Sequence, residues 1–175
     1  MIDFKNFIFS NDLIEEVKIF DRNTYLIREG EIVKHVFWIK KGTIRAFVLD
    51  EDGNEQIIRF GYPGNIISSL SAIFKNEKSD LYLHAIKKCE VLVIPVQKLW
   101  DIKTNSDFSA IWMKMLEDLV CQQIEREKDL LIADPKLRFE RVFRRSPALF
   151  QEIPLKHIAN YLKMTPETLS RIRKS

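Results

Sequence analysis

The sequence predicts an α+β protein in which a β sandwich or barrel is followed by a long helix and a C-terminal helix-turn-helix. All five glycines lie between residues 30 and 64, where short runs of β-forming residues alternate with turns, as in sandwiches and barrels. After residue 97 the apolar residues recur at spacings of three and four, which is the period of a helix. The stretch 155–174 carries the apolar pattern of two short crossing helices.

Residues 1–23 are predicted to form a short amphipathic helical segment at the start of the chain. The apolar side chains that suggest this helix are Phe4, Phe7, Ile8, Leu13, Ile14 and Val17.

Residues 24–96 are predicted to be β structure. The runs 43–49 and 55–60 are rich in β-formers, and Ile44, Ala46 and Val48 share one face of the first run. Between them Asp52-Gly53 predicts a hairpin turn, because glycine tolerates the positive φ that such a turn needs. Further strands are predicted at 36–39 and at 89–94, the second of which ends before Pro95.

One amphipathic helix of roughly 25 residues, about 37 Å long at 1.5 Å per residue, is predicted within 97–133, and Pro135 is predicted to end it. Its apolar stripe packs either on the β domain or on the same helix of a second copy, as in a coiled-coil dimer. Gln123 and the charged run 125–128 weaken a strict heptad pattern. The residues assigned to a dimer helix are Trp112, Met115, Leu116, Leu119, Val120, Gln123 and Ile124.

The C-terminal segment differs from the rest of the chain in charge. Residues 134–175 hold ten Lys or Arg minus four Asp or Glu, a net charge of +6, whereas residues 1–133 hold 18 minus 21, or −3. A basic segment on a slightly acidic body suggests a polyanionic partner. Taken alone, the charge favours the alternative, a solvated helical surface.

Several classes of protein are not expected. The longest uncharged run, 60–74, is 15 residues long and contains Pro63, which is too short for a membrane span. Asp3 and Lys5 precede no apolar stretch, so we expect no signal peptide and a cytoplasmic location. Two cysteines 32 positions apart and three scattered histidines provide no disulfide framework, metal site or cofactor ligand set.

An enzyme is also not expected. The sequence contains no glycine-rich phosphate loop followed by lysine, no nucleophile–histidine pairing and no paired carboxylates in apolar surroundings.

The stretch 155–174 is predicted to be a helix-turn-helix. Ala159 is small where two helices approach closely, and Thr165 followed by Pro166 marks the start of the second helix. Lys163 stands where such turns usually have glycine and is expected to adopt a left-handed conformation at a cost of roughly 1 kcal/mol. The alternative is an ordinary helical hairpin. The buried side chains are expected to be Ile158, Leu162, Met164, Leu169 and Ile172.

The second helix is predicted to read DNA, because such helices enter the major groove N-terminal end first. Arg171 is able to donate two hydrogen bonds to guanine, and Glu167 to accept one from cytosine. The other residues assigned to DNA binding, some of which position the helix on phosphates, are Thr165, Pro166, Thr168, Ser170, Arg173 and Lys174.

The chain resembles the Crp/Fnr family, the cyclic-AMP receptor protein and fumarate–nitrate regulator type, and most closely its short members with no assigned effector. The resemblance implies a cyclic-nucleotide-binding-type jelly roll, a long dimer helix and a winged-helix-like DNA-binding domain, with boundaries expected at 1–106, 107–133 and 134–175. The matching stretches are 28–31, 37–42, 50–55, 60–64, 90–94 and 153–174.

The resemblance also implies partners: double-stranded DNA, a second copy of the chain, RNA polymerase and a small effector, with no membrane. In nucleotide-binding members a glutamate holds the ribose and an arginine about ten residues later neutralises the cyclic phosphate. Here Ser69 and Ser79 occupy those places, and Asp80 adjoins the second. A missing charge-assisted hydrogen bond costs roughly 1.5–3 kcal/mol, so we expect no tight binding of cyclic AMP or cyclic GMP.

Two interpretations of the roll interior remain. Polar side chains are able to line a pocket for another small ligand, or the roll is filled by its own apolar side chains and senses nothing. The alternative to a DNA-binding regulator is a small-ligand-binding or protein-interaction module without sequence-specific DNA binding. The residues assigned to the effector pocket are Ser68, Ser69, Ser71, Ser79, Asp80, Tyr82 and His84.

Overall fold

The structure, a computed structural model, describes residues 4–174. The first three residues of the predicted N-terminal helical segment and Ser175 lie outside the described residues. The chain divides into two compact units, which we call unit 1 (Met1–Lys114) and unit 2 (Met115–Ser175). Each unit is described by itself.

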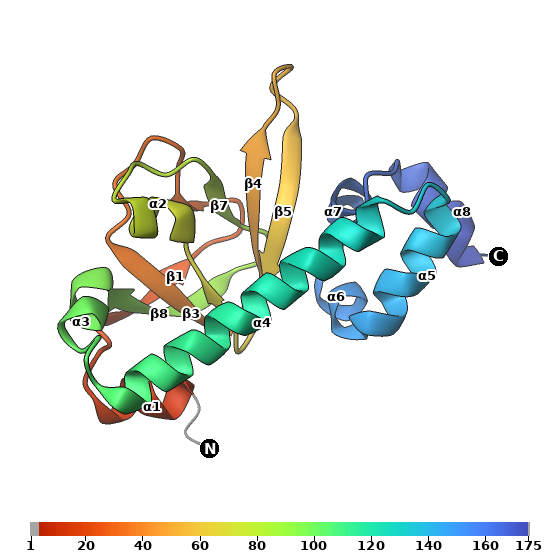
Figure 1. The fold of residues 1–175 in the computed structure, drawn as a ribbon. Helices are drawn as coiled ribbons and strands as arrows, with labels where there is room; N and C mark the ends of the chain where they lie inside the picture. Colours follow the sequence, from red (N-terminus) through yellow and green to blue (C-terminus); the bar gives the residue numbers. More distant parts are fainter. Residues whose placement is uncertain (1–3, 175) are drawn as a thin grey trace. The chain divides into compact units, whose positions relative to one another are not determined.

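Unit 1 is a β sandwich of two four-stranded antiparallel sheets, which confirms the predicted jelly roll (Figure 1). The strand order is β1-β8-β3-β6 in the first sheet and β2-β7-β4-β5 in the second. The strands are β1 (Glu16–Phe20), β2 (Tyr25–Ile27), β3 (His35–Lys41), β4 (Ile44–Leu49), β5 (Glu55–Gly61), β6 (Ile66–Ile67), β7 (Tyr82–Ala85) and β8 (Cys89–Pro95).

The main core of unit 1 lies between the two sheets. Ile39 and Val91 of the first sheet and Ile44 and Leu83 of the second are fully buried in it. A second apolar cluster covers the other face of the first sheet. It is built from helices α1 (Phe4–Ser10) and α3 (Val96–Asp101) and the start of α4 (Ser106–Leu130), where the Phe7 and Phe108 rings lie 5.9 Å apart.

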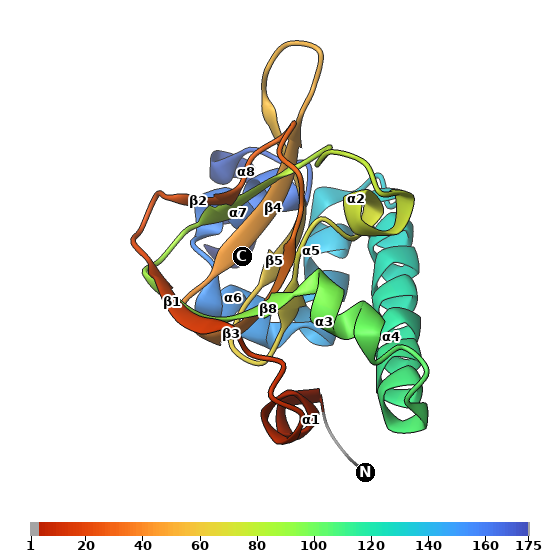
Figure 2. The same cartoon turned by 90° about the vertical axis from the view of Figure 1, so that its left-hand side faces the viewer.

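The predicted hairpin between β4 and β5 is confirmed, and it extends beyond the rest of unit 1 in Figures 1 and 2. Gly53 has φ +77°, as the turn requires. The Asp50 carboxylate accepts hydrogen bonds from the backbone N–H groups of Asp52 (3.1 Å) and Asn54 (2.8 Å). The hairpin therefore satisfies its own backbone donors.

The helical prediction for residues 1–23 is wrong over its second half. The first part is helix α1, but residues 16–20 form strand β1, in which Val17 pairs with Leu92 and Ile19 with Glu90. The alternation of apolar and charged residues over 16–19 has period two, and pairing with β8 overrides the weaker helical pattern. A short helix, α2 (Leu70–Lys75), also interrupts the predicted β region.

Unit 2 contains the second half of α4 and four further helices: α5 (Pro135–Arg145), α6 (Pro147–Glu152), α7 (Leu155–Tyr161) and α8 (Pro166–Lys174). The predicted long helix is confirmed as the 25-residue α4, which follows the separate helix α3. Pro135 does not end it, contrary to prediction. It is the first residue of α5, where a missing N–H costs nothing, and Asp134 caps the helix by accepting from the Lys136 N–H at 2.7 Å.

An ion-pair cluster joins the last turns of α4 to α5. The Asp129 side chain is 2% exposed and accepts from the Arg141 Nε at 2.8 Å and from Arg145. Glu125, one turn earlier, accepts from Arg141 Nη2 at 2.5 Å. Because a buried carboxylate is stable only when it is paired, this cluster fixes α5 against the end of α4.

Replacing Gly42 with alanine should destabilise unit 1 strongly. Gly42 has φ +89°, and an added Cβ would lie 2.3 Å from the Lys88 carbonyl oxygen and 2.7 Å from the Cys89 Cα. These are backbone atoms that cannot rotate away. We expect a loss of about 3 kcal/mol or more in the free energy of unfolding, from left-handed strain plus the clash, in urea titrations followed by tryptophan fluorescence.

Gly53→Ala is the matched control. Gly53 also has a positive φ, but an added Cβ would meet nothing within 4 Å, so its expected loss is only about 1–2 kcal/mol. All three tryptophans (Trp38, Trp100 and Trp112) belong to unit 1, so the signal reports this unit. Equal losses for the two variants would contradict the argument from close backbone approach.

Replacing Asp129 with asparagine should loosen α5. The variant keeps the shape of the side chain but removes the buried carboxylate charge, so that Arg141 and Arg145 keep only Glu125 as an ion-pair partner, at an expected cost of about 2 kcal/mol. That cost corresponds to amide exchange in α5 that is faster by more than tenfold. Glu127→Gln is the control, because Glu127 lies on the same helix and is exposed; its exchange rates should match those of the unmodified chain.

The cluster should also weaken in acid. The Lys128 ammonium, followed by Arg141 and Arg145, lowers the pKa of Glu125 below its ordinary value of 4.5. A carboxyl whose pKa is lower in the folded state contributes stability above its unfolded pKa and loses it as the pH falls through the folded value. Protection of the α5 amides, measured relative to the intrinsic exchange rate at each pH, should therefore fall only below about pH 4.5, and unchanged protection there would contradict a role for Glu125.

Candidate nucleic-acid interface

The pair α7–α8 is held together by a small apolar core. Ile158 and Ala159 of α7, Leu162 just after it and Leu169 of α8 are each at most 1% exposed. Met164 and Ile172, also predicted to be buried, are half-buried. Ala159 has no side chain beyond Cβ, so α8 is able to approach α7 closely. The predicted helix-turn-helix packing is therefore confirmed for its central residues.

The turn between these helices has the predicted geometry. Lys163 has φ +54°, which is the left-handed conformation expected at this position. The Met164 N–H donates to the Ala159 carbonyl at 3.0 Å, and the Thr165 hydroxyl accepts from the Thr168 N–H at 3.2 Å. Thr165 is thus the N-cap of α8, which sets the residue at which the helix begins.

The outer face of α8 is polar and accessible. Residues 167, 170, 171 and 174 follow the pattern i, i+3, i+4, i+7 and are all exposed, so they share one side of the helix. Arg173, Thr165 and Pro166 are exposed as well, whereas Thr168 is half-buried. The hydroxyls of Thr165 and Thr168 lie 3.1 Å apart, so these two side chains already interact in the cap.

The positive charge of residues 134–174 is not all available to a partner. Arg138 is 8% exposed, and Arg141 and Arg145 pair with Asp129. The remaining seven basic side chains of this segment are exposed: Lys136, Arg144, Lys156, Lys163, Arg171, Arg173 and Lys174.

The residues assigned to a dimer helix lie in two environments. Trp112 belongs to an aromatic cluster of unit 1, with its ring 5.6 Å from that of Phe108 and 6.0 Å from that of Trp100. Met115, Leu116 and Leu119 are half-buried, whereas Val120, Gln123 and Ile124 are exposed. Met113, which the sequence analysis did not select, is also 59% exposed.

The predicted effector-pocket residues separate into two groups. In the first, the Asp80 carboxylate accepts from the Ser71 hydroxyl at 2.8 Å and from the Ser69 hydroxyl at 3.3 Å. Ser79 is buried, and its hydroxyl donates to the Leu81 carbonyl. Ser68 instead donates to the His35 carbonyl of β3.

The second group, Tyr82 and His84, lies on the second sheet. Their neighbours Leu83 and Ala85 point into the core, so Tyr82 and His84 face the opposite side. The Tyr82 ring stacks on Phe47 at 5.0 Å. Burial, followed by the nearby Arg45 guanidinium, lowers the pKa of His84. The described structure therefore does not gather all seven residues around one point.

The sequence analysis did not predict which charged residues form ion pairs with one another. The ion-pair cluster of unit 2 combines two acids four residues apart on α4 with two arginines four residues apart on α5. Such complementary spacing was a usable signal. No comparable local pattern marks the two-bond pairing of Arg45 with Glu55, because these residues meet only after β4 and β5 pair.

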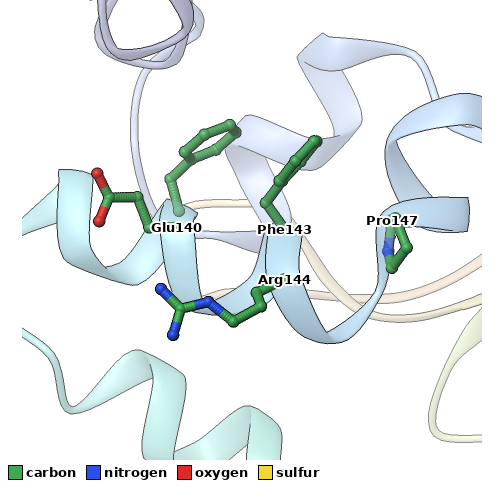
Figure 3. Close-up of a pocket in the computed structure, with 5 residues that line it drawn as sticks. Glu140, Phe143, Arg144 and Pro147 are labelled. Carbon is green, nitrogen blue, oxygen red and sulfur yellow. The ribbon is translucent and has the colours of Figure 1, made fainter.

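Unit 2 also carries a shallow depression on α5 and the start of α6 (Figure 3). Phe143, which is 49% exposed, lies beside Glu140, Arg144 and Pro147. The rings of Phe139, Phe143 and Phe150 contact one another at 5.1–5.6 Å between centroids. These ring contacts therefore help to hold α6 against α5.

Two general findings concern the residues that the structure describes. Within 4–174, no helix is both long enough and apolar enough to cross a membrane. The same residues contain no group of three or more His, Cys, Asp or Glu side chains placed to hold a metal ion.

Comparison with known sequences gives a match to one family model and to a set of regulatory proteins. Residues 17–106 match the family model of the cyclic nucleotide-binding domain. The Anaerobic regulatory protein of Haemophilus influenzae is 23% identical over 180 residues, covering 93% of this chain and 67% of that protein. The Fumarate and nitrate reduction regulatory protein of Escherichia coli is 25% identical over 177 residues, with coverages of 93% and 69%. The chain thus spans about two thirds of the length of these relatives.

Solved structures share the fold. FixK2 from Bradyrhizobium japonicum superposes with a TM-score of 0.75 at 19% identity, covering 91% of this chain and 82% of that one. A CooA mutant from Carboxydothermus hydrogenoformans gives a TM-score of 0.74 at 16% identity, with coverages of 99% and 83%. The family match, the relatives and the shared architecture agree with the motifs read from the sequence, and the chain belongs to the Crp/Fnr family of transcription regulators.

Proposed function

We propose that this regulator binds double-stranded DNA as a homodimer and reads a palindromic site with residues 165–174. The observation that carries the proposal is the two-sided character of α8. Leu169 is fully buried against α7, while the opposite side presents Glu167, Ser170, Arg171 and Lys174 to solvent. A helix anchored in this way is able to enter the major groove without unfolding its own core.

The chemistry of the exposed side matches base and phosphate recognition. Arg171 has the planar set of donors that pairs with the O6 and N7 atoms of guanine, and Glu167 is able to accept from the cytosine amine. Arg173 and Lys174 supply charge for phosphates, which position the helix without reading sequence. Affinity should therefore fall steeply with salt.

A homodimer would place two such helices about 34 Å apart, one turn of DNA. Helix α4 supports this arrangement because it keeps large apolar side chains in solvent. Val120 is 58% exposed and Ile124 is 46% exposed, one helical turn apart. Pairing this stripe with the same stripe of a second copy would remove it from water.

We propose further that the roll does not use cyclic AMP or cyclic GMP as its effector. Among the residues assigned to the effector pocket, Ser69, Ser71 and Asp80 form one hydrogen-bonded polar cluster. None of these side chains carries the positive charge that a cyclic phosphate requires. RNA polymerase and an unidentified small effector remain the further partners that the family resemblance suggests.

A second candidate function is protein interaction without sequence-specific DNA recognition. The observation in its favour is the aromatic depression on α5, where Phe143 is 49% exposed next to Arg144. This candidate predicts that any DNA binding is independent of sequence, so gel shifts that compare a selected fragment with unrelated DNA of the same length, each at two salt concentrations, separate the two functions.

Replacing Arg171 with alanine should remove base discrimination. Genomic fragments bound by the unmodified chain would be selected first, and affinities measured by fluorescence anisotropy on the selected site and on its single-base variants. We expect a loss of about 1–3 kcal/mol, confined to one base position in each half-site. A loss of the same size on every sequence would show that Arg171 contacts only phosphate.

Arg173→Ala is the matched control for this experiment. It removes the same charge from the same helix, and it should weaken binding to all sequences equally. The slope of log affinity against log salt concentration should become shallower by about the amount that one phosphate contact contributes. If neither variant changed affinity for the selected fragments, the proposed role of α8 would be refuted.

Placing glutamates at Val120 and Ile124 should prevent dimerisation. Four carboxylates would then face one another across the proposed helix pair, and burying unpaired charge is costly. We expect the doubly substituted chain to sediment as a monomer at micromolar concentration, where the unmodified chain sediments as a dimer. Circular dichroism should be unchanged, because glutamate favours helix.

Gln122→Glu adds an exposed carboxylate to the same helix about 200° around its axis from position 120. It should leave the dimer intact. A dimer that survives both glutamates at positions 120 and 124 would place the interface elsewhere.

A further inference from the structure

Two of the residues assigned to the effector pocket, Ser69 and Ser71, already donate to the carboxylate of Asp80, which directly follows Ser79 at the place predicted for a ligand phosphate. The Ser71 hydroxyl donates to Asp80 Oδ1 at 2.8 Å, and the Ser69 hydroxyl donates to the same oxygen at 3.3 Å. The two serine oxygens lie 3.4 Å apart. One carboxylate oxygen thus gathers both hydroxyls, which lie nine and eleven positions earlier in the sequence.

The arrangement is anchored on both sides. Ser69 is fully buried and directly precedes α2. Next to Asp80, Ser79 is 3% exposed and its backbone makes two hydrogen bonds of 2.8 Å, one to the Glu31 carbonyl and one from the Gly30 N–H. The Ser79 hydroxyl also donates to the Leu81 carbonyl at 2.8 Å. The residue that precedes Asp80 is therefore fixed by its backbone, which limits the positions that the Asp80 carboxylate is able to take.

This geometry does not fit a cyclic nucleotide, although residues 17–106 match that domain family. A cyclic phosphate carries one negative charge and needs hydrogen-bond donors or a cation. The two hydroxyls already donate to Asp80, and a phosphate brought to them would meet a like charge. The lysines of the same segment, Lys75 and Lys78, are both exposed.

We propose that Asp80 is a built-in anion that occupies the ligand-anion position of this roll. It satisfies the donors that a phosphate would use, so the segment from Ser69 to Leu81 is ordered without any effector. Asp80 is then the residue that determines specificity by excluding anionic ligands. This inference deepens the proposal that cyclic nucleotides are not effectors and does not depend on DNA binding.

Asp80→Ala in the full chain tests this inference, with inorganic phosphate and cyclic AMP as separate probes. The variant should show amide exchange over 69–81 that is faster by roughly tenfold than in the unmodified chain, because its two serine donors lose their acceptor. Millimolar phosphate, at constant ionic strength, should restore much of the protection in the variant and change nothing in the unmodified chain. Cyclic AMP should bind weakly to the variant, because no cation neutralises its phosphate, but more tightly than to the unmodified chain, because the like charge of Asp80 is gone.

Three further variants test whether the effect is specific to the Asp80 carboxylate. Ser71→Ala combined with Asp80→Ala removes a donor and should abolish the rescue by phosphate. Asp52→Ala deletes an exposed carboxylate from the β4–β5 hairpin and should gain no anion binding. Asp80→Asn keeps an oxygen acceptor without the charge, so if the alanine variant does not fold it tests the exclusion of anions alone: exchange over 69–81 should stay close to that of the unmodified chain, while cyclic AMP should bind more tightly than to the unmodified chain.

Two results would overturn the inference. One is binding of cyclic AMP to the unmodified chain as tight as to the Asp80 variants, since Asp80 would then exclude nothing. The other is an Asp80 variant that exchanges like the unmodified chain and gains no anion binding. Neither result changes what is expected of the DNA titrations with Arg171→Ala. The proposal for Asp80 and the proposal for α8 are therefore able to fail independently.

Discussion

The burial of Leu169 against Ile158 and Leu162 is the interaction on which the proposed DNA-binding surface depends. Each of these side chains is at most 1% exposed. A fully buried leucine contributes on the order of 2 kcal/mol through the hydrophobic effect, and it also sets the rotation of α8 about its own axis. With residue 169 turned inward, the helical period places residues 167, 170, 171 and 174 outward. Any loss of this core would therefore misplace every candidate base contact together.

Charges that seem alike in the sequence have different roles in the structure. Arg141 and Arg145 neutralise the buried Asp129 and hold α5 to the end of α4, whereas Arg171 is exposed on α8. The net charge of +6 in the C-terminal segment therefore overstates the charge available for phosphates. Counting bases along the chain identifies a basic segment, but it does not separate structural arginines from those able to bind a polyanion.

The roll follows the same principle of internal pairing. Arg45 pairs with Glu55 across the β4–β5 hairpin, and Asp80 pairs with Ser69 and Ser71. In both cases a polar side chain finds its partner within unit 1. A roll of this kind retains the fold of a nucleotide-binding domain while its polar groups stabilise the domain itself.

Much of the architecture was readable from the sequence because it depends on local chemistry. Gly53 with a positive φ, Thr165 as a helix cap and Lys163 in a left-handed turn each follow from the conformational preferences of a few neighbouring residues. Helix α4 follows from apolar spacing over 25 residues. For the same reason, the helix-turn-helix and its exposed residues could be located before any coordinates were available.

Tertiary structure decided what depends on residues distant in the chain. Residues 16–20 form a strand only because β8 offers unpaired backbone groups beside them. The error at Pro135, in contrast, concerned a local signal, because its neighbour Asp134 is the N-cap that marks the start of a helix. Asp80 lies eleven and nine positions after Ser69 and Ser71 in the sequence, and only folding brings its carboxylate to their hydroxyls. Local preferences act over a few residues, whereas strand pairing and buried charge pairing are satisfied only when the whole chain has closed.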